Sequence, residues 1–309
     1  MQSNLDLVPT GISLKRTYAF EESDLNRAED WALPLWRYVQ LNVPFSAEVS
    51  ALRDQELSEV LHERFVSYVF SRLIIGACHA LEKAKEQNAG TEKSAALLAD
   101  AVDAVLDVDP NVRDTMVWYL NRIAERISRG QANLSPGQRK AIVRKATEHG
   151  HRCYMCGRTL HYKKRPFGAD DTPNIDKIRS KLAFEIEHIW SQARGGGRAR
   201  TNLAASCNEC NKLKRHLVSF ADLAVEQIMT TATSPDSIRA AMSGDSRFAL
   251  IWRQGGCCAV CNDNFYDVDS EHLFLVKRET SQPYHFLNMM AVCQNCNSTH
   301  QLNGVDLRA

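Results

Sequence analysis

Two stretches that share one pattern decide the fold of this chain: CYMC at 153–156, followed by NLAASCNECN at 202–211. The same order returns as CAVC at 258–261 and NMMAVCQNCN at 288–297. In both copies the third cysteine lies five positions after the first Asn, and the last Asn directly follows the fourth cysteine. A repeat of this kind predicts two copies of one small fold.

Eight of the ten cysteines belong to these four Cys-x-x-Cys pairs. Four thiolates from two such pairs form a closed tetrahedral site of the structural kind, so we expect one Zn²⁺ in each copy. Thioredoxin-like redox motifs are the alternative, but neither pair lies in a βαβ pattern. The expected zinc ligands are Cys153, Cys156, Cys207 and Cys210 in the first copy and Cys258, Cys261, Cys293 and Cys296 in the second.

The start of the sequence has no basic segment followed by an apolar one, so no signal peptide is expected. No run approaches the length of a membrane span. We therefore expect a cytoplasmic protein with no membrane partner, a setting in which paired cysteines favour metal over disulfides.

The basic residues gather in the middle of the chain. Residues 1–135 hold 14 Lys and Arg against 20 Asp and Glu (−6), and 136–220 hold 18 against 7 (+11). Residues 221–309 hold 6 against 10 (−4), so the three parts sum to the net charge of +1. Uneven charge can reflect solvated faces alone, but a block this large favours a surface that binds a polyanion.

Apolar residues recur at helical spacing from about residue 23 to 129, and this region carries no metal-ligand cluster. After a boundary at Gly130–Leu134, Ser135 and Gln138 form the pattern of a capping box that opens a helix. The sequence thus predicts an α+β chain with an N-terminal α-helical domain followed by two zinc-knuckle ββα-metal units. The predicted boundaries are 1–134, 135–220 and 221–309.

Between the paired cysteines of the first copy lie FEIEHIW at 184–190 and an Arg-Gly-Gly-Gly turn at 194–197. The order Cys-x-x-Cys, acidic residue and His, Gly-rich turn, Asn-Leu, Cys-x-x-Cys-Asn and basic helix resembles the HNH, or ββα-metal, nuclease superfamily. The resemblance covers about residues 135–217 and none of the helical region. It implies a metal-dependent endonuclease that hydrolyses phosphodiester bonds of DNA or RNA with Mg²⁺ or Mn²⁺.

A neutral His can accept a proton from water near pH 7, so His188 is the expected general base. The resemblance implies that Glu187 and Asn211 bind the catalytic cation and that Asn202 steadies the base and its loop. Family members mostly carry Asp where Glu187 stands, and Glu185 on the same strand face is the alternative ligand. The expected nucleic-acid contacts are Arg194, Arg198, Arg200, Lys212, Lys214 and Arg215. The insertion with Tyr162–Arg165 and Lys177–Lys181 is a further candidate or a plain solvated loop.

The second copy aligns Glu271, His272, Asn288 and Asn297 with the residues of the first. It lacks the Gly-rich turn and the basic helix, and an acidic surface repels phosphate. We expect a degenerate, non-catalytic copy that braces the first or binds a partner.

Two other interpretations remain open for the whole chain. One is a non-catalytic zinc-finger subunit that only binds nucleic acid within a larger complex. The other is based on the order of the domains. This order is similar to that in HNH subunits of bacterial anti-phage systems, such as Septu-type systems that pair an HNH protein with an ATPase. That similarity implies an effector in defence whose helical domain binds a protein partner.

Overall fold

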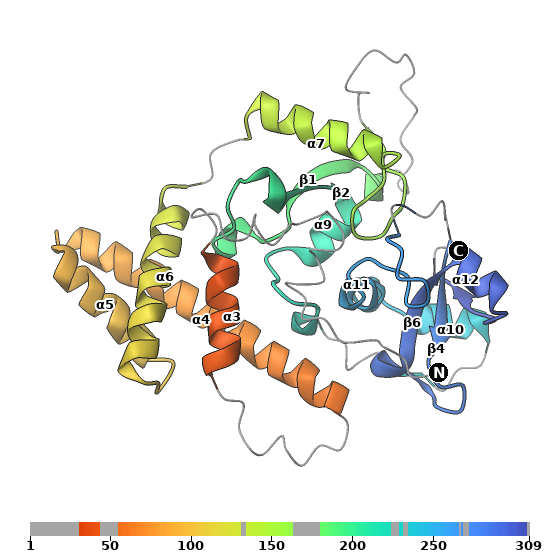
Figure 1. Cartoon of the computed structure of the whole chain (residues 1–309), viewed down its shortest axis with the longest axis horizontal. Coiled ribbons are helices and arrows are strands. Elements are labelled where there is room, and N and C mark those ends of the chain that lie inside the picture. Colours follow the sequence, from red (N-terminus) through yellow and green to blue (C-terminus); the bar gives the residue numbers. More distant parts are fainter. Residues whose placement is uncertain are drawn as a thin grey trace. The chain divides into compact units, whose positions relative to one another are not determined.

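Figure 1 shows the computed structural model of the chain, which describes residues 31–43, 55–130, 134–162, 180–223, 229–230, 234–265, 267 and 272–307. Helices and short strands are both present, as predicted for an α+β chain. The described residues divide into two compact units. One, here called the knuckle unit, holds Leu134–Glu187 and Leu203–Ala309, and the other, the helical unit, joins the N-terminal helices to His188–Asn202.

The described residues of the helical unit form the helices α3 (Ala32–Asn42), α4 (Gln55–Glu86), α5 (Thr91–Asp103) and α6 (Pro110–Ser128). Asp109 caps α6, because its carboxylate accepts a hydrogen bond from the backbone N–H of Asn111 at 2.8 Å and Pro110 fits the first helical position. Helix α4 packs against both α5 and α6. The core consists of apolar side chains from these helices, including Trp36, Phe70, Leu73, Leu120 and Ile123.

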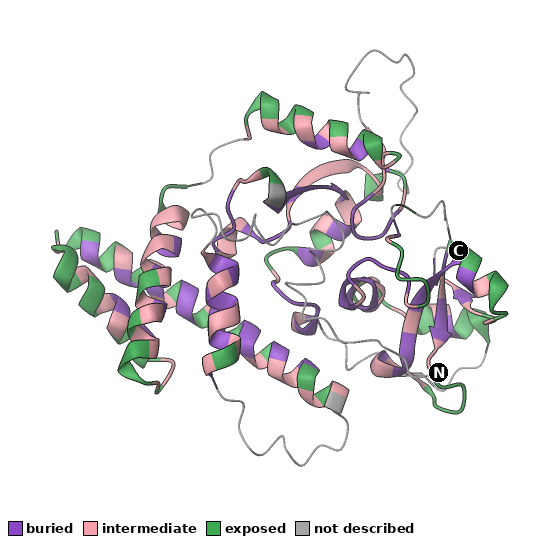
Figure 2. Cartoon of the chain, in the orientation of Figure 1, coloured by how far each residue is buried: buried purple, intermediate pink, exposed green. Residues whose placement is uncertain are grey.

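Helix α4 is long and apolar enough to cross a membrane by length and composition, which differs from the expectation that no run approaches such a span. However, 50% of its most apolar window is buried inside the protein. Figure 2 shows buried and exposed residues alternating along α4, as in a helix with one face in a protein core. The packing therefore accounts for the apolar character of α4.

The loop from His188 to Asn202 belongs to the core of the helical unit. The indole of Trp190 is 6% exposed, and its ring centroid lies 6.0 Å from that of Trp36 and 5.6 Å from that of Phe70. Gly195 adopts a φ of 84°, and a Cβ there would lie 2.5 Å from the Cγ2 of Ile123. This grouping differs from the predicted division, which placed residues 135–220 in one domain.

The knuckle unit begins with α7 (Pro136–Glu148). The predicted capping box is present, with bonds of 3.2 Å from Gln138 N–H to the Ser135 hydroxyl oxygen and 3.0 Å from Ser135 N–H to the Gln138 side chain. After the first Cys-x-x-Cys pair, β1 (Phe184–His188) and β2 (Leu203–Cys207) form a two-stranded sheet, and α9 (Asn208–Lys214) follows directly. Short 3₁₀ turns occupy Gln192–Arg194, Arg200–Asn202 and Phe220–Asp222.

The second copy repeats this order of elements. Helices α10 (Pro235–Ala241) and α11 (Gly244–Arg253) precede its first cysteine pair. Strands β4 (Leu273–Lys277), β6 (Met289–Cys293) and β7 (Val305–Asp306) form a sheet in the order β6-β4-β7, and α12 (Gln294–Thr299) follows β6. A further two-stranded antiparallel sheet pairs β3 (Met229–Thr230) with β5 (Tyr284–His285).

Backbone hydrogen bonds confirm that the two copies share one fold. The residue after the first cysteine of each copy donates to the strand before the third: Tyr154 N–H to Ala205 O at 2.9 Å, and Ala259 N–H to Ala291 O at 3.1 Å. Likewise, Leu160 N–H donates to His151 O and Phe265 N–H to Gly256 O. The internal repeat predicted from the cysteine spacing is therefore present in the structure.

Replacing Trp190 with Ala should lower the free energy of unfolding by about 3–5 kcal/mol, because it empties an aromatic position in the core of the helical unit. Urea titration followed by circular dichroism measures this change. The matched control is Trp118→Ala on α6, whose side chain is 47% exposed and should cost less than about 1 kcal/mol. Equal effects of the two substitutions would contradict the docking of the loop.

Candidate active site

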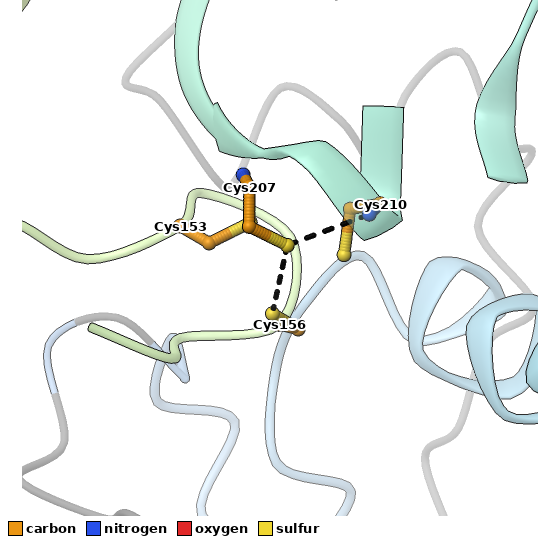
Figure 3. Close-up of side chains that lie close together, drawn as sticks. All are labelled: Cys153, Cys156, Cys207 and Cys210. Carbon is orange, nitrogen blue, oxygen red and sulfur yellow. Dashed lines mark hydrogen bonds between the residues drawn. The ribbon is translucent and has the colours of Figure 1, made fainter. Parts of the chain in front are cut away.

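The first cysteine cluster brings Cys153 and Cys156 together with Cys207 and Cys210, at the junction of β2 and α9 (Figure 3). The four sulfur atoms lie within 4.8 Å of one another, and all four residues are buried. The thiols share hydrogen bonds, which lower the pKa of Cys156 and raise the pKa of Cys207 and Cys210, so without a metal the cluster does not release all of its protons together. The donor set and its closed geometry fit a structural Zn²⁺.

The second cluster repeats this arrangement with Cys258, Cys261, Cys293 and Cys296, again within 4.8 Å. The backbone N–H of Cys293 donates to the sulfur of Cys258 at 3.3 Å, as Cys207 does to Cys153 at 3.4 Å in the first cluster. Both clusters thus fit the expected zinc sites. Each cluster joins the turn of its first Cys-x-x-Cys pair to the strand–helix junction that carries the second pair.

Glu209 of α9 anchors the first knuckle to the second copy. It accepts a short hydrogen bond from Arg158, and Arg247 of α11 lies 3.4 Å away. Burial works to raise the pKa of Glu209, but the hydrogen bond and charge of Arg158 hold it below its ordinary value. Arg158 also donates to the sulfur of Cys156 at 3.5 Å. This cluster has a structural role beside the zinc site.

Glu187 lies in a buried ion pair with Lys214. Its Oε1 is 2.7 Å from the ammonium of Lys214, and its Oε2 accepts a hydrogen bond of 2.9 Å from the hydroxyl of Tyr154. The exposed fractions are 4% for the Glu187 side chain and 1% for that of Lys214. Lys214 is therefore not a surface contact for nucleic acid, and that part of the prediction is wrong. Both oxygens of Glu187 are already engaged by protein groups.

Glu185 meets the expected second metal ligand instead. It shares a strand face with Glu187, since side chains two residues apart on a strand point the same way. Its two carboxylate oxygens accept short hydrogen bonds from the side-chain amides of Asn208 and Asn211 on α9. Glu185 and Asn211 are both only half-buried, so this carboxylate–amide pair combines hard oxygen donors with access to solvent.

His188 ends β1, and Asn202 closes the loop that follows it. Asn202 is 1% exposed and its side chain makes three hydrogen bonds. It accepts from the N–H of Trp190 at 2.6 Å and donates to the carbonyls of Trp190 and Gly197 at 3.0 and 2.7 Å. The amide thus fixes the backbone two residues after His188, as steadying the loop requires.

The other predicted nucleic-acid contacts differ in exposure. Arg200, Lys212 and Arg215 are exposed, whereas Arg194 and Arg198 are half-buried. Arg198 donates to the carbonyl of Gly130 at 3.3 Å. Most of the basic insertion, residues 163–179, lies outside the described residues.

Residues 153–216 match the family model described as HNH endonuclease. This matched segment is called the HNH domain below. The match spans the first cysteine cluster, β1, β2 and α9, and it covers none of helices α3 to α6. No curated protein and no solved structure matched the chain.

The second copy keeps the zinc cluster of the HNH domain but not its acidic residue and His. Asn288 holds its own hairpin as Asn202 does, accepting from Glu279 N–H at 2.9 Å and donating to the carbonyls of Glu279 and Pro283. Arg278 N–H donates to Asn288 O, as Ile189 N–H does to Asn202 O. These equivalent bonds align Arg278 with Ile189. In the strand before them, Lys277 therefore occupies the position of His188, Val276 that of Glu187 and Phe274 that of Glu185.

The predicted alignment of Glu271 and His272 with Glu187 and His188 is therefore wrong by five residues. His272 lies just before β4 and its Nδ1 is 2.6 Å from Asp306 Oδ2, while Glu271 lies outside the described residues. Where Glu185 meets Asn211 in the HNH domain, the second copy has Phe274, and Asn297 accepts from Gly304 N–H at 2.9 Å. The described residues of the second copy thus lack the carboxylate–amide pair.

Metal analysis of the purified chain should find two Zn²⁺ per molecule, because each cluster offers four thiolates. Cys261→Ser removes one ligand from the exposed edge of the second cluster and should reduce the content to about one. The control, Cys78→Ser, lies on α4 outside both clusters and should retain two. Fewer than two in the wild type would contradict the pair of zinc sites.

Proposed function

We propose that this chain is a metal-dependent HNH endonuclease that hydrolyses phosphodiester bonds of nucleic acid, with His188 as general base. The observation that carries the proposal is the pairing of Glu185 on β1 with Asn211 on α9, within a segment that matches the HNH model. A purely structural zinc knuckle needs no such pair, and the second copy, which lacks it, keeps its zinc cluster.

The divalent cation, Mg²⁺ or Mn²⁺, would be held by Glu185 and Asn211. When bound, such a cation would neutralise the charge that develops on the phosphate and the leaving oxygen. Glu187, the ligand that the family resemblance implies, already has a cationic partner in Lys214. We therefore assign Glu187 to holding α9 against the first knuckle, and Glu185 to the cation.

The remaining residues prepare and position the reactants. The neutral imidazole of His188 takes a proton from the attacking water. Asn202 holds the backbone of Trp190, so the direction in which the chain leaves His188 is fixed. The exposed Arg200, Lys212 and Arg215 offer positive charge to the phosphates of the substrate.

A role in bacterial defence rests on the similarity of domain order to Septu-type HNH subunits. The helical unit offers one supporting feature. Tyr68 and Ile75 are 65% and 57% exposed and lie seven residues apart, on one face of α4. An exposed apolar pair of this kind fits contact with a protein partner, such as an ATPase subunit. We propose this partnership, and a cytoplasmic location, as extensions of the nuclease function.

The cleavage assay incubates the wild type and His188→Ala with DNA and with RNA in Mg²⁺ or Mn²⁺. Loss of the general base should reduce the rate by about 10²–10⁴-fold. His216→Ala, an exposed histidine of the same segment, is the control and should keep the wild-type rate. Equal cleavage by wild type and His188→Ala would sink the assignment of the base. Binding without cleavage would favour the non-catalytic zinc-finger subunit.

Glu185→Gln and Glu187→Gln separate the two carboxylates of β1. Glu185→Gln should abolish cleavage at low Mn²⁺ and raise the Mn²⁺ concentration needed for half-maximal rate, while the unfolding free energy changes little. Glu187→Gln leaves the ammonium of Lys214 buried without its counter-charge, so it should cost about 3–5 kcal/mol of stability. In the fraction that stays folded, its Mn²⁺ requirement should match the wild type. The opposite pattern would make Glu187 the metal ligand.

A further inference from the structure

An open cleft of about 670 Å³ lies within the helical unit, between the C-terminal half of α6 and the loop that follows His188. From α6 and its C-cap it is lined by Arg122, Arg126 and Arg129, and from the loop by Gly196, Gly197 and Arg198. His188 belongs to the same compact unit. The cleft is therefore built partly from the HNH hairpin and partly from helices outside the family match.

The cleft is positively charged although the surrounding region is acidic. Arg122, Arg126 and the C-cap residue Arg129, whose backbone stays in the helical region, follow one another at spacings of four and three residues, so they share one helix face. With Arg198 they give four positive charges against one lining carboxylate, that of Glu125. Arg129 and Glu125 form an exposed pair at 3.3 Å, which solvent screening makes weak and easily exchanged for a phosphate.

Aromatic rings lie directly beside these arginines. The guanidinium of Arg126 lies 4.4 Å from the ring centroid of Trp31, which also lines the cleft. The guanidinium of Arg122 lies 3.6 Å from the ring centroid of Trp118, which is 47% exposed. Arginines interleaved with aromatic rings are typical of surfaces that track a sugar–phosphate backbone and stack its bases.

Gly196 fixes the shape of the loop that forms one wall of the cleft. A Cβ at Gly196 would lie 1.9 Å from the carbonyl oxygen of Trp190, so a larger residue cannot occupy this position without moving the loop. Positive charge, the ring of Trp31 and this closely packed loop thus meet in one groove.

We propose that this cleft binds the sugar–phosphate backbone of a nucleic-acid strand, so that helices outside the family match contribute to substrate binding. This inference rests on the proposed nuclease function. An acidic segment of a protein would match the charge of the cleft, but the stacking rings and the position after His188 favour a nucleic acid. The helical unit would then serve the substrate as well as a protein partner.

The binding test uses the full chain carrying His188→Ala, so that bound oligonucleotide is not cut. Fluorescence polarisation measures the Kd of labelled 20-nucleotide single strands and duplexes of DNA and RNA at several salt concentrations. Adding Arg122→Gln and Arg129→Gln should weaken the best of these complexes roughly tenfold or more. The slope of log K against log salt should fall by about 1.4 to 1.8, the value for two lost phosphate contacts.

Arg113→Gln is the matched control, since Arg113 lies on the same helix but pairs with Asp103 and is not part of the cleft lining. It should leave Kd and salt slope unchanged, and thermal melting should show that all variants are folded. Unchanged affinity in the double variant would overturn the proposal. A labelled polyglutamate peptide is measured in the same way. If the double variant keeps its oligonucleotide binding but loses its binding of this peptide, the proposal is overturned and the cleft is assigned to an acidic protein segment.

Cleavage by the chain with His188 intact separates this inference from the proposed function. If the chain cuts nucleic acid and Arg122→Gln/Arg129→Gln changes neither KM nor Kd, the cleft proposal fails and the nuclease stands. If the chain cuts nothing but the double variant loses binding, the cleft is a nucleic-acid site and the nuclease proposal fails.

Discussion

The packing of Trp190 against Trp36 and Phe70 is the interaction on which the site depends. Strands β1 and β2 belong to one compact unit, whereas the loop between them belongs to the core of the other. His188 stands where the chain passes from the first unit to the second. The residues after it are held by the Trp190 packing, and Asn202 fixes the backbone of the same loop.

Two carboxylates on one strand have different surroundings, and this separates their chemistry. Strand alternation directs both Glu185 and Glu187 to the side of α9. Glu187 is enclosed with Lys214 and Tyr154, where removing one partner leaves an uncompensated charge. Glu185 accepts hydrogen bonds from the side-chain amides of Asn208 and Asn211 on α9 and stays half-buried. A motif match alone does not distinguish a carboxylate that is open to a metal ion from one that is already paired with a buried ammonium group.

Short-range chemistry was largely predictable from the sequence. Cysteine spacing predicted both zinc clusters and the repeat, and Ser135 with Gln138 predicted the start of α7, because these signals depend on neighbours in the chain. The burial of Lys214 and the docking of Trp190 were not predictable, since nothing local marks a residue's tertiary partners. The alignment of His272 with His188 failed because a Glu-His dipeptide matches in letters, whereas the strand register, visible only in the hydrogen bonds to Asn288, decides which residue takes the position.

The placement of the 188–202 loop also bears on modularity. A segment cut at residues 135 and 220 would carry Trp190 away from the rings that cover it, exposing a large apolar side chain two residues after His188. Grafting this segment into another protein would therefore have to transfer the covering helices with it.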